Sequence, residues 1–167
     1  SDFNAPDFLK TPEPLIQKHF SRIMSLKDGT KKMSKSDLSD LSRINLTDDN
    51  DMIVNKIKKA KTDPKLMPTG EENLKERPEA ENLLGIYSSL SNQNLDQSKK
   101  EFSGKNFAEF KEKLSSLLVE KISPISKEIK KLLSDQKYLD NILLEGSQKA
   151  DTIASKKINE MKKLIGF

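Results

Sequence analysis

The spacing of apolar residues predicts a chain that is helical from Thr47 onward. Beyond that point apolar positions recur three and four residues apart, which is the period of a helix with one buried face. Pro78 is placed to begin a second helix, because its missing N–H costs nothing in a first turn. Residues 95–102 predict a shorter third helix. The buried face of the first helix is predicted to comprise Ile53, Ile57 and Ala60.

Two longer apolar stripes follow. The first comprises Phe107, Phe110, Leu114, Leu117, Leu118, Ile122, Ile125, Ile129 and Leu132. Pro124 lies inside it, and because an interior proline costs about 3 kcal/mol, we expect a kink or two abutting helices there. The last stripe is interrupted at Gly146 and comprises Tyr138, Leu139, Ile142, Leu143, Ala150, Ile153, Ala154, Met161 and Leu164. No strand alternates with these segments, so the pattern predicts a mainly α fold, a helix bundle with short connections.

The chain before residue 47 has a different pattern. It carries Pro6, Pro12 and Pro14 and no sustained apolar period. Residues 20–26 predict a short strand, with Asp28-Gly29 as its turn. A basic loop then leads to the helices.

Composition excludes several classes of site. Thirty Lys and Arg residues against 26 Asp and Glu give a net charge of +4, which permits a nucleic-acid partner without demanding one. The absence of cysteine excludes disulfides and thiolate catalysis. The single histidine, His19, is expected to be a surface or packing residue, so we predict no metal site. No apolar run approaches the roughly 20 residues of a membrane span, and we expect a soluble, cytoplasmic protein.

Charged residues surround the first predicted helix. The acidic run Asp48-Asp49-Asn50-Asp51 favours the positive end of a helix dipole, and it lacks the glycine and final glutamate of a calcium-binding loop. We expect Lys56, Lys58, Lys59 and Lys61 to form a basic surface. A solvated face is the default for such lysines, and phosphate contacts to an RNA are the alternative.

The run Lys32-Met33-Ser34-Lys35-Ser36 is the strongest chemical signal in the chain. Two lysines three residues apart can surround a polyphosphate, because a compact ammonium on a flexible stem can follow moving phosphates. Ser34 and Ser36 can donate hydrogen bonds to phosphate oxygens. Met33 is expected to dock against the protein body or an adenine, and Gly29 to give the loop backbone freedom. Such cations stabilise the charge that develops on a leaving pyrophosphate.

These five residues resemble the second signature of class I aminoacyl-tRNA synthetases, and their surroundings are similar to the bacterial tryptophanyl-tRNA synthetase family. The similarity extends over nearly the whole chain, in the order that the family shows. It is carried by Arg22-Ile23-Met24-Ser25-Leu26, residues 29–37, Asp48-Asp49, Lys56-Ile57, Ala60, Thr62-Asp63, Arg77-Pro78, Asn82-Leu83-Leu84, Ile86-Tyr87-Ser88, Leu90-Ser91, Phe110-Lys111, Pro124-Ile125, Glu145-Gly146 and Lys149-Ala150.

The resemblance implies an enzyme that joins L-tryptophan to tRNA(Trp) through a tryptophanyl-adenylate, using ATP and Mg²⁺. It implies that residues 1–46 are the end of a Rossmann-type catalytic domain and that residues 47–167 are a helical domain that binds the tRNA anticodon. Lys32 and Lys35 would be catalytic groups at the ATP phosphates, and Ile23 would contact the adenine. The other implied ATP contacts are Met33, Ser34 and Ser36.

The family's HIGH-type motif, its tryptophan pocket and its main dimer surface belong to a part that this chain lacks. We therefore expect the chain alone to be an inactive monomer and a C-terminal half, and the full-length enzyme to be a homodimer. The start at Ser1, without an initiator methionine, suggests a fragment boundary. The equivalent portion of a tyrosyl-tRNA synthetase is an alternative, as is a non-enzymatic helical RNA-binding module. The segments Asn82-Leu83-Leu84 and Ile86-Tyr87-Ser88 favour the tryptophan enzyme.

Overall fold

The structure, a computed structural model, describes residues 5, 8–16, 21–70 and 72–167 of the chain. Both His19 and Phe20, the first residue of the predicted strand, lie outside these residues. The chain divides into two units, one of residues 17–130 and one of residues 1–16 with 131–167.

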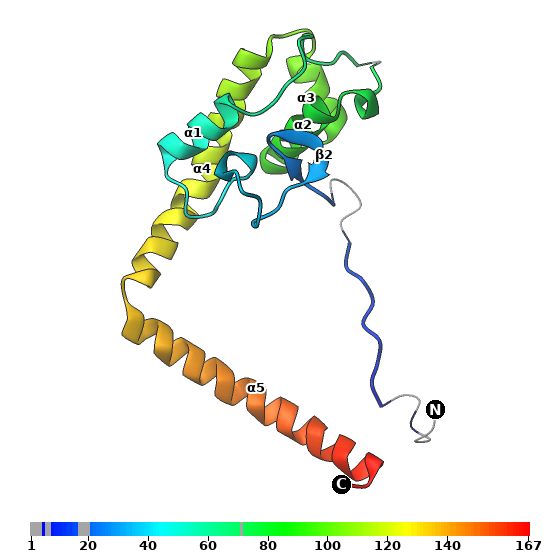
Figure 1. The fold of residues 1–167 in the computed structure, drawn as a ribbon, viewed down its shortest axis with the longest axis vertical. Coiled ribbons are helices and arrows are strands. Elements are labelled where there is room, and N and C mark those ends of the chain that lie inside the picture. The colour runs from blue at the N-terminus through cyan, green and yellow to red at the C-terminus, as the bar shows by residue number, and fades with distance from the viewer. Residues whose placement is uncertain (1–4, 6–7, 17–20, 71) are drawn as a thin grey trace. The chain divides into compact units, whose positions relative to one another are not determined.

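A short hairpin, two single-turn 3-10 helices and five α-helices follow one another along the described chain (Figure 1). The strands are β1 (Met24–Ser25) and β2 (Asp28–Lys32), and the 3-10 helices are η1 (Asp40–Ser42) and η2 (Leu74–Glu76). The α-helices are α1 (Asn50–Lys58), α2 (Pro78–Ser91), α3 (Leu95–Phe102), α4 (Phe107–Leu133) and α5 (Gln136–Ile165). The predicted mainly α class is confirmed.

The core of the unit of residues 17–130 lies where α1, α2, α3 and α4 meet. Its aromatic centre is Phe102, whose ring centroid lies 4.8 Å from those of Tyr87 and Phe110 in edge-on contacts. Such contacts add to the free energy of apolar burial. The core comprises Leu26, Ile53, Ile57, Ala60, Met67, Leu74, Leu83, Leu84, Ile86, Tyr87, Phe102, Phe110, Leu114, Leu118 and Ile122.

Local signals place the starts of α2 and α3 where the sequence predicts them. Pro78 is the first residue of α2, and Asn92 ends that helix with a left-handed backbone, φ 57°. Asn94 begins α3 with a reciprocal capping box, because its side chain accepts from the Gln97 N–H while the Gln97 side chain accepts from the Asn94 N–H.

The predicted buried face of α1 is confirmed, and the predicted basic surface is partly wrong. Ile53 and Ile57 are fully buried, but Lys56 is also buried, with only 2% of its surface exposed. Lys61 lies beyond α1 and pairs with Glu79, the two charged atoms 2.8 Å apart. Lys58, Lys59 and Lys61 are exposed, and of these Lys61 is the one paired with Glu79. Lys56 is buried because it has acidic partners from elsewhere in the chain, which periodicity cannot show.

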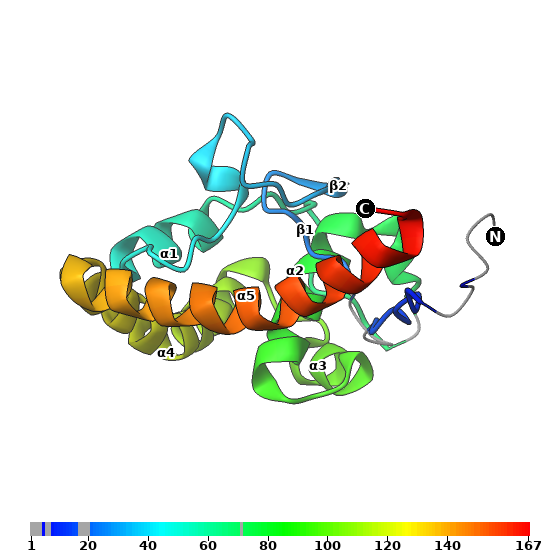
Figure 2. The same cartoon turned by 90° about the horizontal axis from the view of Figure 1, so that it is seen from below.

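The hairpin differs from the sequence prediction in the position of its turn. Leu26 and Lys27 form the turn, so Asp28-Gly29 begins β2 instead of reversing the chain. Leu26 is buried in the core, which places the turn against the helices. The hairpin lies beside α2 in both views (Figures 1 and 2), and Ser25 pairs with Asp28.

The helix α4 is continuous through Pro124, so two abutting helices do not form. Helix α5 is likewise continuous through Gly146 and ends at Gly166, whose positive φ of 88° favours glycine. The side chains of α5 are all at least partly exposed. Within the described ranges, no helix is long and apolar enough to span a bilayer.

Candidate functional site

The lysine loop, Lys32 to Ser36, begins at the last residue of β2. Its first half is attached to the protein body, because the Met33 N–H donates to the Ile23 carbonyl at 3.0 Å. The Met33 side chain is half-buried and packs against the hydrophobic core. Met33 therefore docks against the body, while its neighbours lie at the surface.

Lys32 and Lys35 are exposed, and within the part of the chain that the structure describes neither ammonium has an ion pair or hydrogen bond. The serines between and after them contact each other, with 3.0 Å between the Ser34 and Ser36 hydroxyl oxygens. The Ser36 N–H also points to the Ser34 hydroxyl oxygen, at 3.3 Å. This arrangement presents two cations and two hydroxyls on one exposed loop.

Acidic side chains near the loop have other partners. Asp28 accepts from the Thr30 hydroxyl at 2.6 Å, and the Thr30 hydrogen bonds hold the pKa of Asp28 below its ordinary value. The Lys31 ammonium also lies 3.4 Å from Asp28. Asp37 accepts from the Ser39 N–H at 2.8 Å. These carboxylates are therefore engaged by groups other than Lys32 and Lys35.

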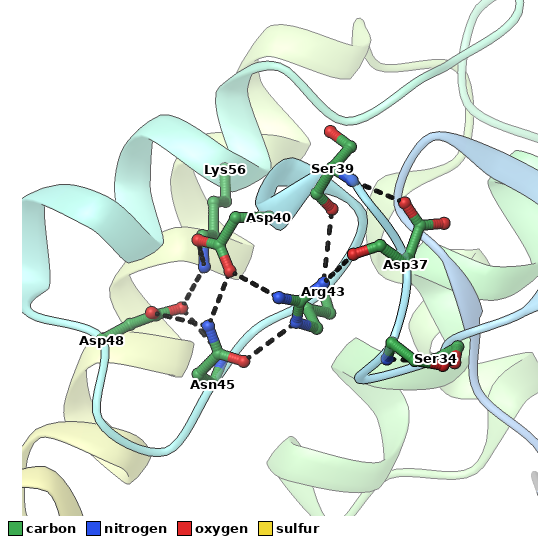
Figure 3. Close-up of polar contacts among 9 residues, drawn as sticks. Ser34, Asp37, Ser39, Asp40, Arg43, Asn45, Asp48 and Lys56 are labelled. Atoms are coloured by element: carbon green, nitrogen blue, oxygen red, sulfur yellow. Dashed lines mark hydrogen bonds and ion pairs between the residues drawn. The ribbon is translucent and has the colours of Figure 1, made fainter.

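A charged network follows the loop (Figure 3). Arg43 donates to the Asp37 carbonyl at 3.0 Å and the Ser39 carbonyl at 3.4 Å. It also lies 3.0 Å from the Asp40 carboxylate. The Lys56 ammonium lies 2.7 Å from Asp40 and 2.6 Å from Asp48, which is 3% exposed. Asn45 completes the set, because its side-chain amide donates to both Asp40 and Asp48 and its oxygen accepts from Arg43.

A groove of about 880 Å³ lies between the hairpin and helices α2 and α3. Arg22, Met24, Asn82 and Asp96 contribute to its lining, whereas Ile23, Lys32 and Lys35 do not line it. Ile23 is 44% exposed. The predicted ATP-binding residues of the loop, Lys32 to Ser36, lie next to one another at the surface. The backbone hydrogen bond from Met33 places Ile23 beside this loop.

Gly29 has a different role from the one that the sequence predicts. A side-chain carbon at this position would lie 2.6 Å from the Pro78 carbonyl carbon and the Glu79 nitrogen. Glycine is therefore required by the close approach of β2 to the start of α2, and not for freedom of a closing loop.

The described residues contain no group of three or more His, Cys, Asp or Glu side chains placed to hold a metal ion. The acids nearest to the lysine loop are also engaged, as described above.

The sequence did not indicate Arg43 at all, and it did not indicate the structural role of Asn82. The Asn82 amide donates to the Met24 carbonyl at 2.9 Å and accepts from the Met24 N–H at 2.8 Å. This pair holds β1 against α2. The one sign of this role in the sequence is that Asn82 directly precedes the apolar residues Leu83 and Leu84. An amide buried beside them requires hydrogen-bond partners.

Comparisons with known proteins agree on one family. A family model described as tRNA synthetases class I (W and Y) matches residues 1–123. The tryptophan–tRNA ligase of Agrobacterium fabrum is 54% identical over 155 residues, which are 93% of this chain and 44% of that protein. The tryptophan–tRNA ligase of Caulobacter vibrioides is 48% identical over 166 residues, 99% of this chain and 48% of that protein. The chain thus spans about half the length of these relatives.

Solved structures show the same architecture. The tryptophanyl-tRNA synthetase of Mycoplasma pneumoniae matches with a TM-score of 0.81 at 26% identity, over 98% of this chain and 49% of that one. The Campylobacter jejuni tryptophanyl-tRNA synthetase, complexed with ADP and tryptophan, matches with a TM-score of 0.65 over the same shares. Its identity is 21%, so this second likeness shows the fold alone.

Proposed function

The chain belongs to the class I tRNA synthetases of the tryptophan and tyrosine family, and we propose that it is the lysine-loop and helical portion of a bacterial tryptophan–tRNA ligase. The full-length enzyme would activate L-tryptophan with ATP and transfer it to tRNA(Trp) in the cytoplasm. The names of the relatives, at 48% and 54% identity, support tryptophan over tyrosine.

One observation carries the proposed chemistry: Lys32 and Lys35 are exposed and unpaired within the described residues, while neighbouring carboxylates are engaged. In amino-acid activation the substrate carboxylate attacks the α-phosphate, and pyrophosphate leaves with growing negative charge. Two free ammonium groups near that charge stabilise the transition state more than the ground state, which increases the rate.

The other proposed ATP contacts follow from their places on the loop. Ser34 and Ser36 donate to phosphate oxygens, and the hydrogen bond between their hydroxyls holds the two groups close together. Met33 keeps the loop attached to the body, and Ile23, joined to it through the backbone, contacts the adenine. Magnesium would accompany ATP.

The two regions have separate proposed roles. Residues 1–46 complete the nucleotide-binding domain, and residues 47–167 form the helical domain that contacts tRNA(Trp). Lys58 and Lys59 remain candidates for phosphate contacts, since Lys56 is buried. We further propose that the full-length enzyme is a homodimer and that this chain alone is an inactive monomer.

The test is ATP–pyrophosphate exchange by the full-length protein, with tryptophan and with tyrosine as substrates. Lys35→Ala is expected to raise the activation barrier by about 3 kcal/mol, the effect of losing one charge stabiliser. Lys31→Ala is the matched control, because Lys31 is exposed, lies on the same segment and already pairs with Asp28.

Each outcome separates the candidates. Exchange with tryptophan alone supports the proposal, and exchange with tyrosine alone assigns the chain to the tyrosyl branch. Equal exchange by the Lys35→Ala variant and the wild type would remove the loop from the mechanism. A protein that exchanges with neither amino acid but binds RNA would support the non-enzymatic module.

A further inference from the structure

We propose that Arg43 and the buried Lys56 are positioning residues that fix the C-terminal end of the lysine loop. The loop is held at its start by β2 and Met33. After Ser36 the chain has no strand or α-helix until Asn50. A loop that must place two ammonium groups on a phosphate chain needs a second fixed end, because small misplacements of catalytic groups reduce rates strongly.

Arg43 supplies that fixed end through backbone contacts. Its guanidinium donates to the carbonyls of Asp37 and Ser39, at 3.0 and 3.4 Å. Asp37 directly follows Ser36, so these bonds hold the first residues beyond the lysine loop. The planar fork of arginine can bind two carbonyls and a carboxylate together, which a lysine ammonium in its place cannot match in geometry.

Arg43 is itself held by Asp40, and Asp40 is held by Lys56 (Figure 3). The Lys56 and Asn45 hydrogen bonds lower the pKa of Asp40, so its carboxylate stays charged opposite Arg43. Arg43 and Lys56 balance the charges of Asp40 and Asp48, and the network is neutral as a set.

Lys56 connects this network to the rigid core. It lies on α1 between Ile53 and Ile57, both fully buried. Because nearly all of its surface is buried, its ammonium has little freedom to move away from Asp40 and Asp48. The contacts thus run from the core through Lys56, Asp40 and Arg43 to the backbone beside Ser36.

This inference rests on the proposed function only for its kinetic part, and hydrogen–deuterium exchange tests its structural part independently. In the full-length protein, Arg43→Gln is expected to speed amide exchange across residues 34–39 by about tenfold, because an exposed loop with one free end opens at little cost. Lys56→Met is expected to have the same effect, through the loss of the contact that holds Asp40.

Lys99→Met is the matched control. Lys99 is also a buried lysine, at 7% exposure, but it donates to the Gly70 and Glu72 carbonyls, away from the lysine loop. Its loss should lower the melting temperature of the protein and leave amide hydrogen exchange at residues 34–39 unchanged. If Lys56→Met does not fold, Arg43→Gln decides the structural test alone.

The kinetic part uses ATP–pyrophosphate exchange. Arg43→Gln is expected to raise the KM for ATP, lower kcat, or both, for a combined loss on the order of tenfold to a hundredfold in kcat/KM. The KM for tryptophan should not change. A general destabilisation of the enzyme would not affect ATP alone in this way. Arg43→Lys should recover only part of the loss.

Two results would overturn the inference: unchanged amide exchange at residues 34–39 in Arg43→Gln, or unchanged ATP kinetics in an active enzyme. A wild-type protein without exchange activity would instead contradict the proposed function. In that case the hydrogen–deuterium result still decides whether Arg43 and Lys56 fix the loop.

Discussion

The backbone of Gly29 lies so close to that of Pro78 that a side-chain carbon on Gly29 would approach the Pro78 carbonyl carbon to 2.6 Å. This contact joins β2 to the first turn of α2, and β2 ends at Lys32. The strand that carries the lysine loop is thus placed by backbone packing on a helix whose buried face forms part of the core.

Gly29→Ala is therefore expected to lower the free energy of unfolding by about 1 to 3 kcal/mol, because backbone must move to admit the methyl group. Chemical denaturation of the variant and the wild-type chain measures the difference. Gly70→Ala is the control, since a side-chain carbon there has open space around it. Its effect should be within about 0.5 kcal/mol, and an equal loss in both variants would show that packing at Pro78 is not the cause.

The two hydrogen bonds of Asn82 to Met24 lead to a second prediction. Asn82→Asp keeps the shape of the side chain and the acceptor for the Met24 N–H, but it places a carboxylate oxygen against the Met24 carbonyl. We expect a loss of about 2 to 4 kcal/mol at neutral pH, from an unpaired buried carbonyl and a buried charge.

The same variant has a testable pH dependence. Burial and the facing carbonyl favour the protonated acid, which raises its pKa in the folded state, and a protonated carboxyl can donate to the Met24 carbonyl. The variant should therefore regain stability as the pH falls below that raised pKa, and lose it as the pH rises through it. Denaturation at several pH values measures this. Asn82→Ala is the control, because its deficit should not vary with pH.

Those parts of the fold that depend on local signals were predictable, and those that depend on distant partners were not. Pro78 marks the start of α2 because its effect is confined to one helical turn, and Asn94 caps α3 through residues three positions away. Lys56 looks like a surface lysine within α1, because its partner Asp40 lies sixteen residues earlier on a segment with no period. Asn82 and Met24 are 58 residues apart, so their pairing also leaves no local pattern.

The candidate site likewise contains residues that the sequence predicts and residues that it does not. The residues of the lysine loop could be identified from the sequence, because a short motif brings the cations and hydroxyls that bind phosphate close together. Arg43 does not stand out, because it acts through backbone carbonyls of Asp37 and Ser39, which any residue type provides. Continuity of α4 through Pro124 also reflects context, since packing of the helix before and after the proline outweighs its local cost.

Arg77 fixes the segment between α1 and α2, and its removal tests a structural ion pair. Its guanidinium is nearly buried and binds Asp63 through two nitrogens, at 2.8 and 2.9 Å, and Glu72 through a third. Arg77→Gln leaves the carboxylate of Asp63 without its cation, so we expect a loss of about 3 kcal/mol in the free energy of unfolding. Thermal and chemical denaturation measure it.

The pH dependence of that loss has a definite sign. Burial is the largest single effect and raises the pKa of Asp63, but the Arg77 hydrogen bonds, the Lys65 N–H and the charges of Arg77 and Lys65 together outweigh it, so the net pKa is lowered. A lowered pKa stabilises the fold above the unfolded value of about 3.9, and this contribution disappears as the pH falls through the folded value. The wild type and Arg77→Gln should therefore converge in stability in acid. A constant difference down to acid pH would mean that Arg77 acts by packing alone.

Tyr87 lies at the centre of the core and should titrate far above an ordinary tyrosine. Burial, together with the hydrogen bond that its hydroxyl donates to Glu101 at 3.0 Å, raises the pKa of Tyr87 to about 12. The chain has two tyrosines, so Tyr138→Phe leaves Tyr87 as the sole reporter. Tyrosinate absorbance of that variant should show a midpoint near 12 when folded, and near about 10 in denaturant.

Because the folded pKa of Tyr87 is the higher one, its contribution to stability is complete below about pH 10 and is lost as the pH rises toward the folded value. Glu101→Gln removes the facing charge but not the burial. We therefore expect that substitution to lower the folded midpoint while keeping it above the denatured one. A folded midpoint equal to the denatured midpoint in the Tyr138→Phe chain would mean that water reaches the Tyr87 hydroxyl, contrary to its packing against Phe102 and Phe110.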